Sequence, residues 1–266
     1  KPNQMKKIVL SLSVIALIAS CTPKTKVDSM AGVYHLEKQV INDGAKDFTY
    51  LAADGRNQIK IYTPESYFYI TATNDSSVGF GVGSYTINDG KVVETNIFNS
   101  GSLDSANTAT LEISNKSDKG YTQFIDGLMM RGTSYKLTEE YSTVASSGTS
   151  ALDGVWHQVK NIEINGTDST DRTYNEYKVF HGGHFMWAAR VLQDTANNGF
   201  SNVIGHGSFT LADNALTENL EMSSMKGITG KYNIILSFNG TDEFTQKSAD
   251  STSKVVGYKT YKKISK

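Results

Sequence analysis

The sequence predicts an all-β protein built from two similar domains in tandem. Segments of the 266-residue chain return in the same order after 118 to 124 residues, which indicates a duplicated domain rather than a short-period solenoid. Pairs of Asn or Asp followed by Gly separate short β-rich runs, and such pairs favour hairpin turns. Beyond the N-terminal segment, no convincing amphipathic helix of about ten or more residues is present.

The N-terminal segment has the features of an export signal that follows the expected initiator Met5. A short basic start precedes an apolar run over 8–18, which is too short to span a bilayer as a permanent helix. The sequence Ile-Ala-Ser-Cys at 18–21 resembles the lipobox of bacterial lipoproteins, in which the signal is cut before the cysteine and the cysteine is acylated. Cys21 is the only cysteine, and lipid attachment explains an unpaired thiol in an exported protein. The alternative is an ordinary secretory signal with an incidental cysteine.

The duplication is clearest at the start of each copy. The segment Gly-Val-Tyr-His-Leu-Glu-Lys at 32–38 returns as Gly-Val-Trp-His-Gln-Val-Lys at 154–160. Further matches join 58–62, 67–69 and 81–85 to 176–180, 185–187 and 205–209. Positions that the fold needs should recur in both copies, and positions that serve one copy alone should not.

Short runs rich in β-branched and aromatic residues lie between the expected turns. Their regular spacing, about 8–15 residues, favours antiparallel barrels or sandwiches over α/β folds. The runs are 60–62, 67–70, 84–87 and 92–98 in the first copy, and 177–180, 185–188, 208–211 and 232–238 in the second. We expect tight turns at Asp43-Gly44, Asp54-Gly55, Asp89-Gly90, Asp126-Gly127, Asn165-Gly166, Asn198-Gly199 and Asn239-Gly240.

The ordered motifs resemble a known family. Gly-Val-Tyr and Gly-Val-Trp at the start of the two copies resemble the Gly-x-Trp motif that opens lipocalins and their calycin relatives. The later motifs are similar to small lipocalin-like domains of exported bacterial lipoproteins of unknown function. The resemblance covers the mature chain twice and implies two tandem antiparallel lipocalin-like β-barrels. The first copy departs from the pattern, because Tyr34 and Tyr69 stand where the second copy has Trp156 and Trp187.

A closed barrel also agrees with physical expectation. Closure leaves no exposed sheet edge, and an aromatic side chain on the first strand can plug one end. Eight strands enclose a space that side chains or one small ligand can fill. We therefore expect five parts: 1–20 upstream residues and lipoprotein signal peptide, 21–29 lipidated cysteine and tether, 30–141 first barrel, 142–151 linker, and 152–266 second barrel.

Charge and the anchor define the expected surroundings of the protein. The chain has 26 basic and 27 acidic residues, and loss of the signal leaves a net charge near −4, which argues against a nucleic-acid partner. We expect acyl chains at Cys21 to hold the protein at a membrane. Thr22 after the cysteine resembles lipoproteins sorted to the outer membrane. With no acidic run after Cys21, we expect the protein to face the periplasm.

Motifs for catalysis and for cofactors are largely missing. Gly79, Gly81 and Gly83 lack the spacing of a dinucleotide-binding motif and indicate a bulge or a sharply coiled strand. The sequence has no nucleophile elbow and no His-Glu-x-x-His motif. We expect no enzymatic activity and no cofactor. Acid–base chemistry by His206 and Glu218 stays open as a third hypothesis, provided that both side chains converge in one pocket.

The histidines have structural explanations. His181 and His184 flank a Gly-Gly turn and could share a metal, but the first copy has no histidine at the matching turn, so we expect no metal site. His35 and His157 recur at the same position of both copies. Recurrence favours a structural role, in which the imidazole bonds a neighbouring backbone group.

Two pairs of opposite charge also recur. Lys60 and Glu94 in the first copy correspond to Lys178 and Glu218 in the second. If these side chains face the lumen, they form buried ion pairs that need full hydrogen bonding and could orient the polar end of a ligand. If they face solvent, each pair contributes about 0–1 kcal/mol. The sequence leaves both arrangements open.

The second copy is the expected site of function, because it alone has both tryptophans and His206, where the first copy has Val82. The residues expected to bind a ligand are Trp156, Lys178, Trp187, His206 and Glu218. We expect a non-enzymatic lipoprotein of the cell envelope whose barrels bind a small apolar or amphipathic molecule. The alternative is an interaction module with filled barrels that binds a glycan or a partner protein. A cavity of about a few hundred Å³ would favour the first interpretation.

Overall fold

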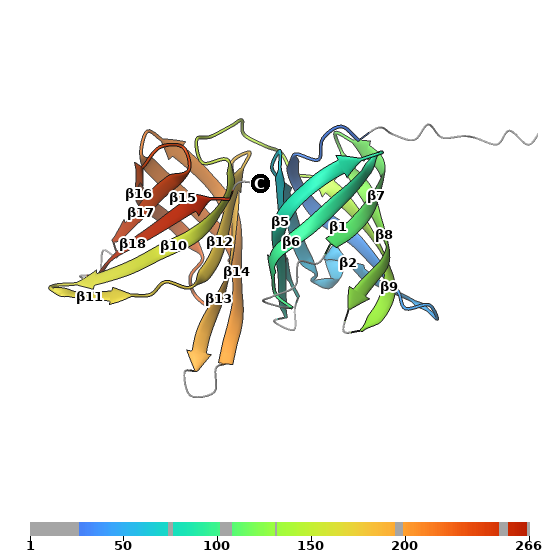
Figure 1. Cartoon of the computed structure of the whole chain (residues 1–266), viewed down its shortest axis with the longest axis horizontal. Coiled ribbons are helices and arrows are strands. Elements are labelled where there is room, and N and C mark those ends of the chain that lie inside the picture. The colour runs from blue at the N-terminus through green and yellow to red at the C-terminus, as the bar shows by residue number, and fades with distance from the viewer. Residues whose placement is uncertain are drawn as a thin grey trace, which may run out of the picture.

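The chain folds into two closed β-barrels (Figure 1). The computed structural model describes residues 27–73, 77–101, 108–130, 132–194, 199–249 and 255–264. Each copy of the duplicated sequence forms a nine-stranded antiparallel sheet, and its first strand also pairs with its last. Eight strands therefore close into a ring, and the second strand of each copy lies outside it. The prediction of an all-β fold with two tandem antiparallel barrels is confirmed.

The first barrel contains one short helical turn besides its strands. The strands are β1 (Gly32–Asn42), β2 (Asp47–Leu51), β3 (Asn57–Tyr62), β4 (Ser66–Ala72), β5 (Val78–Asn88), β6 (Lys91–Asn99), β7 (Thr108–Ser117), β8 (Gly120–Met130) and β9 (Thr133–Thr143). The turn η1 (Ala52–Asp54) follows β2. No helix in the described part of the chain is long and apolar enough to cross a membrane.

The second barrel repeats this order strand by strand. Its strands are β10 (Gly154–Asn165), β11 (Asp168–Asp171), β12 (Asn175–His181), β13 (His184–Asp194), β14 (Gly199–Ala212), β15 (Ala215–Ser223), β16 (Gly230–Phe238), β17 (Glu243–Ala249) and β18 (Val255–Lys263). Because β9 ends at Thr143 and β10 begins at Gly154, the connection covers 144–153. Both ends of this linker lie two residues later than the sequence predicted.

Most of the expected turns that the structure describes connect strands. Asp89-Gly90 joins β5 to β6, and Asn165-Gly166 joins β10 to β11. The prediction of a turn at Asp126-Gly127 is wrong. Gly127, with φ +79°, produces a bulge inside β8 where the register shifts. Asn198 lies outside the described residues, so the turn expected there is not placed.

An aromatic side chain of the first strand closes one end of each barrel. Tyr34 and Trp156 are 2% and 0% exposed. The Tyr34 hydroxyl donates to the Met30 carbonyl oxygen (3.0 Å), and Trp156 Nε1 donates to the Leu152 carbonyl oxygen (2.7 Å). The segment before each first strand therefore folds over the same end, which we call the plugged end. Val27 already packs in the first core, so the barrel begins before residue 29, where the tether was expected to end.

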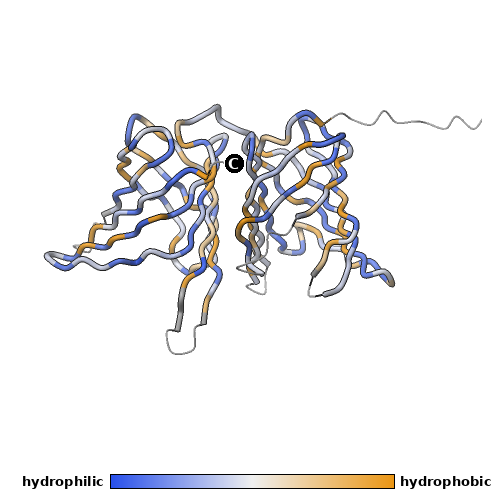
Figure 2. The backbone as a smooth tube through the Cα atoms, in the orientation of Figure 1, coloured by the Kyte–Doolittle hydropathy of each residue, from blue (hydrophilic) through white to orange (hydrophobic). Residues whose placement is uncertain are grey.

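The two barrels contact each other through equivalent outer faces. Side chains that point away from the two lumens form one shared apolar cluster, which contains Val33, Ile61, Phe68, Ile70, Phe80, Val82 and Phe98 together with Val155, Val179, Met186, Ala188 and Ile204. Phe98 also stacks on Tyr177 across the boundary, with ring centroids 5.2 Å apart. Figure 2 shows hydrophobic and hydrophilic residues alternating along the strands. Because the shared cluster covers their outer faces, strands that face the other barrel, such as β4, are buried on both faces.

Glycines in β5 let this strand pass close to its neighbours. A Cβ on Gly81 would lie 2.5 Å from the ring of Tyr69. A Cβ on Gly83 would lie 1.9 Å from the Thr95 carbonyl oxygen, at the bulge where β5 shifts register against β6. The second barrel has glycines at both equivalent positions. The bulge expected from these glycines is confirmed.

This close approach predicts a position-specific loss of stability. We expect Gly83→Ala to lower the free energy of unfolding by about 1–3 kcal/mol, because the added methyl group collides with backbone. Gly79→Ala in the same strand is the matched control, since its Cβ would meet the nearest atoms at 3.8 Å, and its effect should stay below about 0.5 kcal/mol. Urea denaturation followed by circular dichroism measures both. Equal effects of the two substitutions would contradict the packing described here.

Candidate functional site

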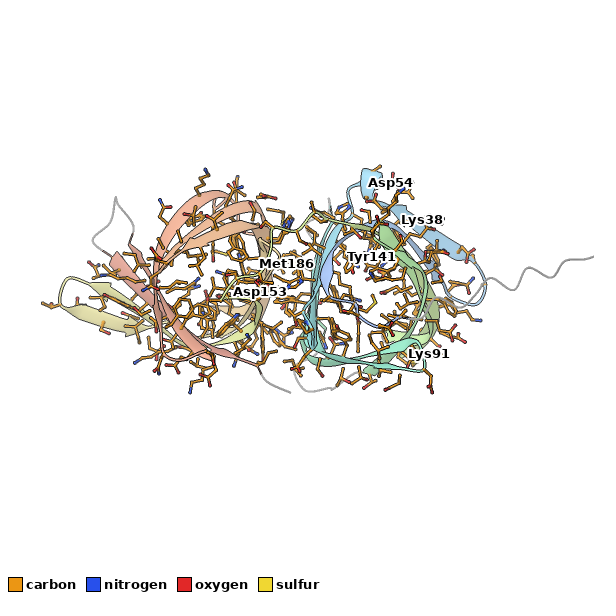
Figure 3. All side chains as sticks on the ribbon, turned by 90° about the horizontal axis from the view of Figure 1, so that it is seen from above. Lys38, Asp54, Lys91, Tyr141, Asp153 and Met186 are labelled. Atoms are coloured by element: carbon orange, nitrogen blue, oxygen red, sulfur yellow. The ribbon has the colours of Figure 1, made fainter. Side chains whose placement is uncertain are left out.

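Each barrel contains a layer of polar side chains that point into the lumen, which we call the polar ring. In the first barrel the ring consists of Gln39, Gln58, Lys60, Glu94, Gln123, Glu139 and Tyr141. At the equivalent strand positions of the second barrel it consists of Asn161, Glu176, Lys178, Glu218, Gln246, Lys259 and Tyr261. Except for the partly exposed Lys259, these side chains are buried. Figure 3 looks along both barrels and shows Tyr141 inside the first.

The recurrent Lys–Glu pairs belong to these rings. Lys60 Nζ lies 2.7 Å from Glu94 Oε1, and Lys178 Nζ lies 2.5 Å from Glu218 Oε1. The four side chains are between 3% and 8% exposed, so the pairs face the lumen and not solvent. A buried ion pair is costly unless further hydrogen bonds satisfy its atoms. The Tyr62 hydroxyl supplies one of them to Glu94.

The second polar ring contains another ion pair. Lys259 Nζ lies 3.0 Å from Glu176 Oε2 and donates to the Tyr174 hydroxyl at 3.3 Å. Burial alone raises the pKa of the Glu176 carboxyl, but the Lys259 ammonium and the Tyr261 hydroxyl outweigh burial, and the pKa is lowered. Two ammonium groups therefore face two carboxylates in this ring.

The first polar ring lacks the second ammonium group. Gln58 stands at the position of Glu176, and Glu139 stands at the position of Lys259. The donors to the Glu139 carboxylate are Gln39 Nε2 (2.6 Å), Gln58 Nε2 (3.2 Å), Gln123 Nε2 (2.5 Å) and the Tyr141 hydroxyl (2.9 Å). All four donors are uncharged. The Tyr141 hydroxyl stays protonated because burial, and next the charge of Glu139, raise its pKa. Among the described residues, Glu139 forms no ion pair.

A cavity of about 560 Å³ lies in the first barrel, on the side of the polar ring away from the plugged end. The polar ring lines its inner part. Its apolar wall consists of Ile41, Val78, Ala109, Ile125, Leu128 and Leu137. The lining also includes Tyr69, Arg56, Asn96 and, near the start of β5, Thr71, Thr73, Ser77 and Gly79. The cavity is therefore polar at its inner part, and its outer part combines the apolar wall with the polar side chains of β4 and β5 and Arg56.

Two polar atoms of the residues lining this cavity are buried and have no hydrogen-bond partner in the described part of the chain. They are Gln39 Oε1, an acceptor, and Arg56 Nε, a donor. Arg56 precedes β3, and its guanidinium group lies over the Tyr50 ring of β2, 4.4 Å from the centroid. Unpaired buried polar atoms are rare in folded proteins and often mark a place where a ligand or water binds.

The five residues expected from the sequence do not form one site. Trp156 plugs its barrel, whereas Lys178 and Glu218 pair in the polar ring. Trp187 is half-buried and packs against the core of the second barrel. His206 points out of the barrel. None of the five lines the cavity of the first barrel.

His206 lies on the outer face of β14, where the two barrels meet. Its strand partner belongs to the shared apolar cluster. Burial lowers the pKa of His206 to about 4; Glu221 opposes this effect, while His184 and His35 add to it. Glu218 faces the lumen, so the two residues lie on opposite sides of the sheet. The convergence that acid–base chemistry by this pair requires is absent.

The His-Gly-Gly-His turn holds the linker. His184 Nε2 donates to the Ala145 carbonyl oxygen (2.8 Å), and the Ser147 amide donates to the Gly182 carbonyl oxygen (2.8 Å). His181 Nδ1 lies 3.4 Å from a carboxylate oxygen of Asp153. Within the described ranges, no group of three potential metal ligands occurs.

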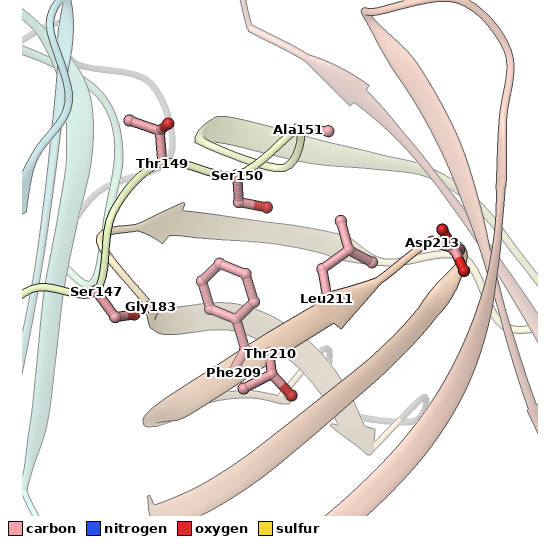
Figure 4. Close-up of a pocket in the computed structure, with 9 residues that line it drawn as sticks. All are labelled: Ser147, Thr149, Ser150, Ala151, Gly183, Phe209, Thr210, Leu211 and Asp213. Carbon is pink, nitrogen blue, oxygen red and sulfur yellow. The ribbon is translucent and has the colours of Figure 1, made fainter.

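A surface hollow of about 400 Å³ lies between the linker and β14 (Figure 4). Its lining is Ser147, Thr149, Ser150, Ala151, Gly183, Phe209, Thr210, Leu211 and Asp213. Hydroxyl groups dominate this lining, and it contains one acidic residue and no basic one. The hollow has none of the buried, convergent charged groups that the first barrel provides.

The recurrent histidines bond side chains and not the backbone partners that we expected. His35 Nδ1 lies 3.2 Å from Glu37 Oε1, and His157 Nε2 lies 3.1 Å from Asn175 Oδ1. The His157 ring also stacks on Tyr177 at 4.5 Å. Both contacts lie on the outer surface of β1 and β10, away from the polar rings.

The sequence matches no protein-family model and no curated protein. Among solved structures, one similar chain is a protein of unknown function from the DUF3598 family of Nostoc punctiforme, which is 9% identical; the match covers 88% of this chain and 96% of that chain, with a TM-score of 0.27. Another is described as a "putative outer membrane protein" of Bacteroides fragilis, which is 14% identical; the match covers 88% and 97%, with a TM-score of 0.25. At these scores the likeness supports no conclusion about this chain.

Sequence reasoning missed Gln39, Gln123, Glu139 and Tyr141. For Gln58 the sequence held an indication of a place in the lumen. Gln58 lies two residues before Lys60 on β3, so both side chains point to the same face, and it corresponds to Glu176 in the repeat. The last strand of each copy gave a weaker indication of the polar ring. Tyr141 and Tyr261 recur, whereas the residue two positions earlier is Glu in the first copy and Lys in the second. Aligning β9 with β18 would have revealed it.

His206 predicts a pH-dependent contribution to stability. Its pKa of about 4 in the folded protein lies below the value of about 6.5 expected when unfolded, so the unfolded state binds the proton first as pH falls. The stability that depends on neutral His206 is present above pH 6.5 and is lost as pH falls toward 4, by on the order of 3 kcal/mol.

The substitution His206→Val installs the residue that the first copy has at this position and should remove that part of the pH dependence. Urea denaturation at pH 7, 5.5 and 4 measures it: the variant should gain stability relative to the parent protein as pH falls. A constant difference between the two proteins across this range would show that His206 is not buried as described.

Proposed function

We propose that the first barrel binds one small amphipathic molecule. The cavity of about 560 Å³ carries this proposal, because its inner part is polar and it also has an apolar wall, which includes Ile41, Leu128 and Leu137. The volume lies in the range of pockets that bind small ligands, about 300–1,000 Å³. An eight-stranded barrel has room for one such ligand. The polar group of the ligand would lie at the polar ring, and its apolar part along the wall.

This proposal moves the site from the second barrel to the first. The second ring balances its own charges through Lys178–Glu218 and Lys259–Glu176. The first ring leaves Glu139 without an ion pair in the described structure, and it borders the cavity. This difference between the rings supports different roles for the two barrels: the first binds the ligand, and the second has a structural role at the shared apolar interface.

We propose that this binding is not coupled to catalysis. His206 and Glu218 lie on opposite faces of the sheet, so they cannot act together as acid and base, and this supports the proposal. The carboxylates of the first ring are engaged by Lys60 and by uncharged donors, an arrangement suited to holding a polar group in place.

The ligand proposal is tested by filling the cavity. The wild-type chain should bind N-phenyl-1-naphthylamine, an uncharged probe that fluoresces in apolar surroundings, with one site per chain. Ala109→Trp places a large ring in the lumen and should weaken this binding at least about tenfold, a loss of about 1.4 kcal/mol or more.

Thr110→Trp is the matched control, because Thr110 is the neighbouring residue of β7 and is exposed. It should bind the probe as the wild type does. A wild-type chain that binds no probe, or equal binding by the two variants, would refute a ligand site in this lumen.

We also infer that the protein is a lipoprotein of the outer membrane that faces the periplasm, and that its barrels are relatives of the lipocalin-like domains of exported lipoproteins. The repeated Gly-x-Trp-like motif and the lipobox-like sequence before Cys21 support this inference. Cys21 and the signal segment lie outside the described residues. The tether would join the first barrel at its plugged end, so the cavity mouth is at the far end of the barrel from the anchor.

Lipid attachment has a direct test. When the protein is expressed in a Gram-negative host with an alkyne-labelled fatty acid, the chain should incorporate the label and sediment with membranes. Cys21→Ser should abolish both, because the sulfur is the acceptor. Thr22→Ala, which leaves the cysteine in place, should retain the label. Labelling of Cys21→Ser would contradict the proposed anchor.

A further inference from the structure

The starting observation is a difference in charge between two otherwise matched polar rings. Glu139 of β9 pairs in register with Gln39 of β1, and Lys259 of β18 pairs in the same way with Asn161 of β10. The same place in the barrel wall therefore carries an acid in one copy and a base in the other. The first ring holds two carboxylates and one ammonium group, whereas the second holds two of each.

Burial makes this difference energetically important. Glu139 is 4% exposed, and an ionised carboxylate in such a place is costly unless a cation or several donors compensate it. Its four donors are neutral amide and hydroxyl groups. A cation near Glu139 would therefore add an attraction that the described first barrel does not supply.

The second barrel shows how such a cation is held. There the Lys259 ammonium group contacts one carboxylate, Glu176, and one hydroxyl, Tyr174. The first barrel differs at these positions, with Gln58 in place of Glu176 and Glu139 in place of Lys259. Gln39 Oε1, next to Glu139, is a buried acceptor with no partner among the described residues. Tyr69 and Tyr141 line the same cavity, and aromatic rings attract cations.

We propose that the ligand of the first barrel carries an ammonium head group, which binds Glu139 and Gln39 in the first polar ring. This inference rests on the proposed function and specifies its ligand class: a cationic amphiphile whose apolar part lies along Leu128 and Leu137. The head group supplies the charge that the first ring lacks, and its N–H groups pair the free acceptor.

Arg56 is the competing group. It lines the same cavity, but it precedes β3 near the mouth, and its guanidinium group already lies over Tyr50. An anionic head group at Arg56 would leave the deeper charge of Glu139 uncompensated. An anionic head group at Lys60 would compete with Glu94, which lies 2.7 Å away. The charge distribution therefore favours a cation.

Three probes with the same ten-carbon chain separate these possibilities: decylammonium, decanol and decanoate, titrated into the full chain at pH 7 by calorimetry. We expect decylammonium to bind about tenfold or more tighter than decanol, because its ammonium group forms a charged hydrogen bond to Glu139. Decanoate should bind more weakly than decanol. Equal affinities for all three would overturn the head-group inference. Absence of binding by all three would instead overturn the proposed function.

Variants then locate the preference. Glu139→Gln should lower decylammonium affinity about tenfold or more and remove its preference over decanol, measured on the same variant. The double substitution Gln58→Glu and Glu139→Lys copies the Glu176–Lys259 pair of the second barrel. It gives the first ring two ammonium groups and two carboxylates, and it should also remove the preference. Arg56→Gln should retain it. A preference for decanoate that Arg56→Gln abolishes would show that the head group is an anion bound at the mouth.

Discussion

The buried ion pairs Lys60–Glu94 and Lys178–Glu218 are the constraint on which both barrels depend. Each joins two strands across the lumen, from β3 to β6 and from β12 to β15, and its charges are almost completely removed from water. Such a pair survives only when further polar groups surround it, which explains the layer of glutamine, glutamate and tyrosine side chains at the same height. The polar ring then divides the lumen into a plugged aromatic end and a second part. In the first barrel that second part is open to a ligand.

Duplication has kept this constraint and changed the side chains around it. Glycines, the first-strand aromatic residue and the Lys–Glu pair recur because packing and electrostatics require them in both copies. The second acid lies on different strands in the two copies, on β12 as Glu176 and on β9 as Glu139, and the first ring has no ammonium group that corresponds to Lys259. One lumen is balanced by its own ion pairs, and the other offers a free acceptor and an unpaired negative charge beside a cavity. We infer that this divergence separates a binding barrel from its structural partner.

Local signals in the sequence were sufficient for the fold, because hairpin turns, strand alternation and the duplication are all visible there. They were insufficient for the site. On β3 both Ile61 and Lys60 are buried, one against the other barrel and one in the lumen, so alternation could not reveal which face Lys60 occupies. His206 suggested a pocket, but it faces an interface between barrels that no local pattern discloses. Glu139 lies outside the matched motifs, and only the pairing of β9 with β1 brings it to Gln39.

The location of the ligand is the central claim, and methyl NMR spectroscopy of the full chain titrated with decylammonium tests it most directly. Chemical-shift changes should occur at the methyl groups that line the cavity wall, on Ile41, Ile125, Leu128 and Leu137, and the core methyl groups of Leu216 and Leu236 in the second barrel should stay unchanged. Shifts confined to the second barrel, or to Leu211 in the hollow beside the linker, would contradict a ligand site in the first barrel.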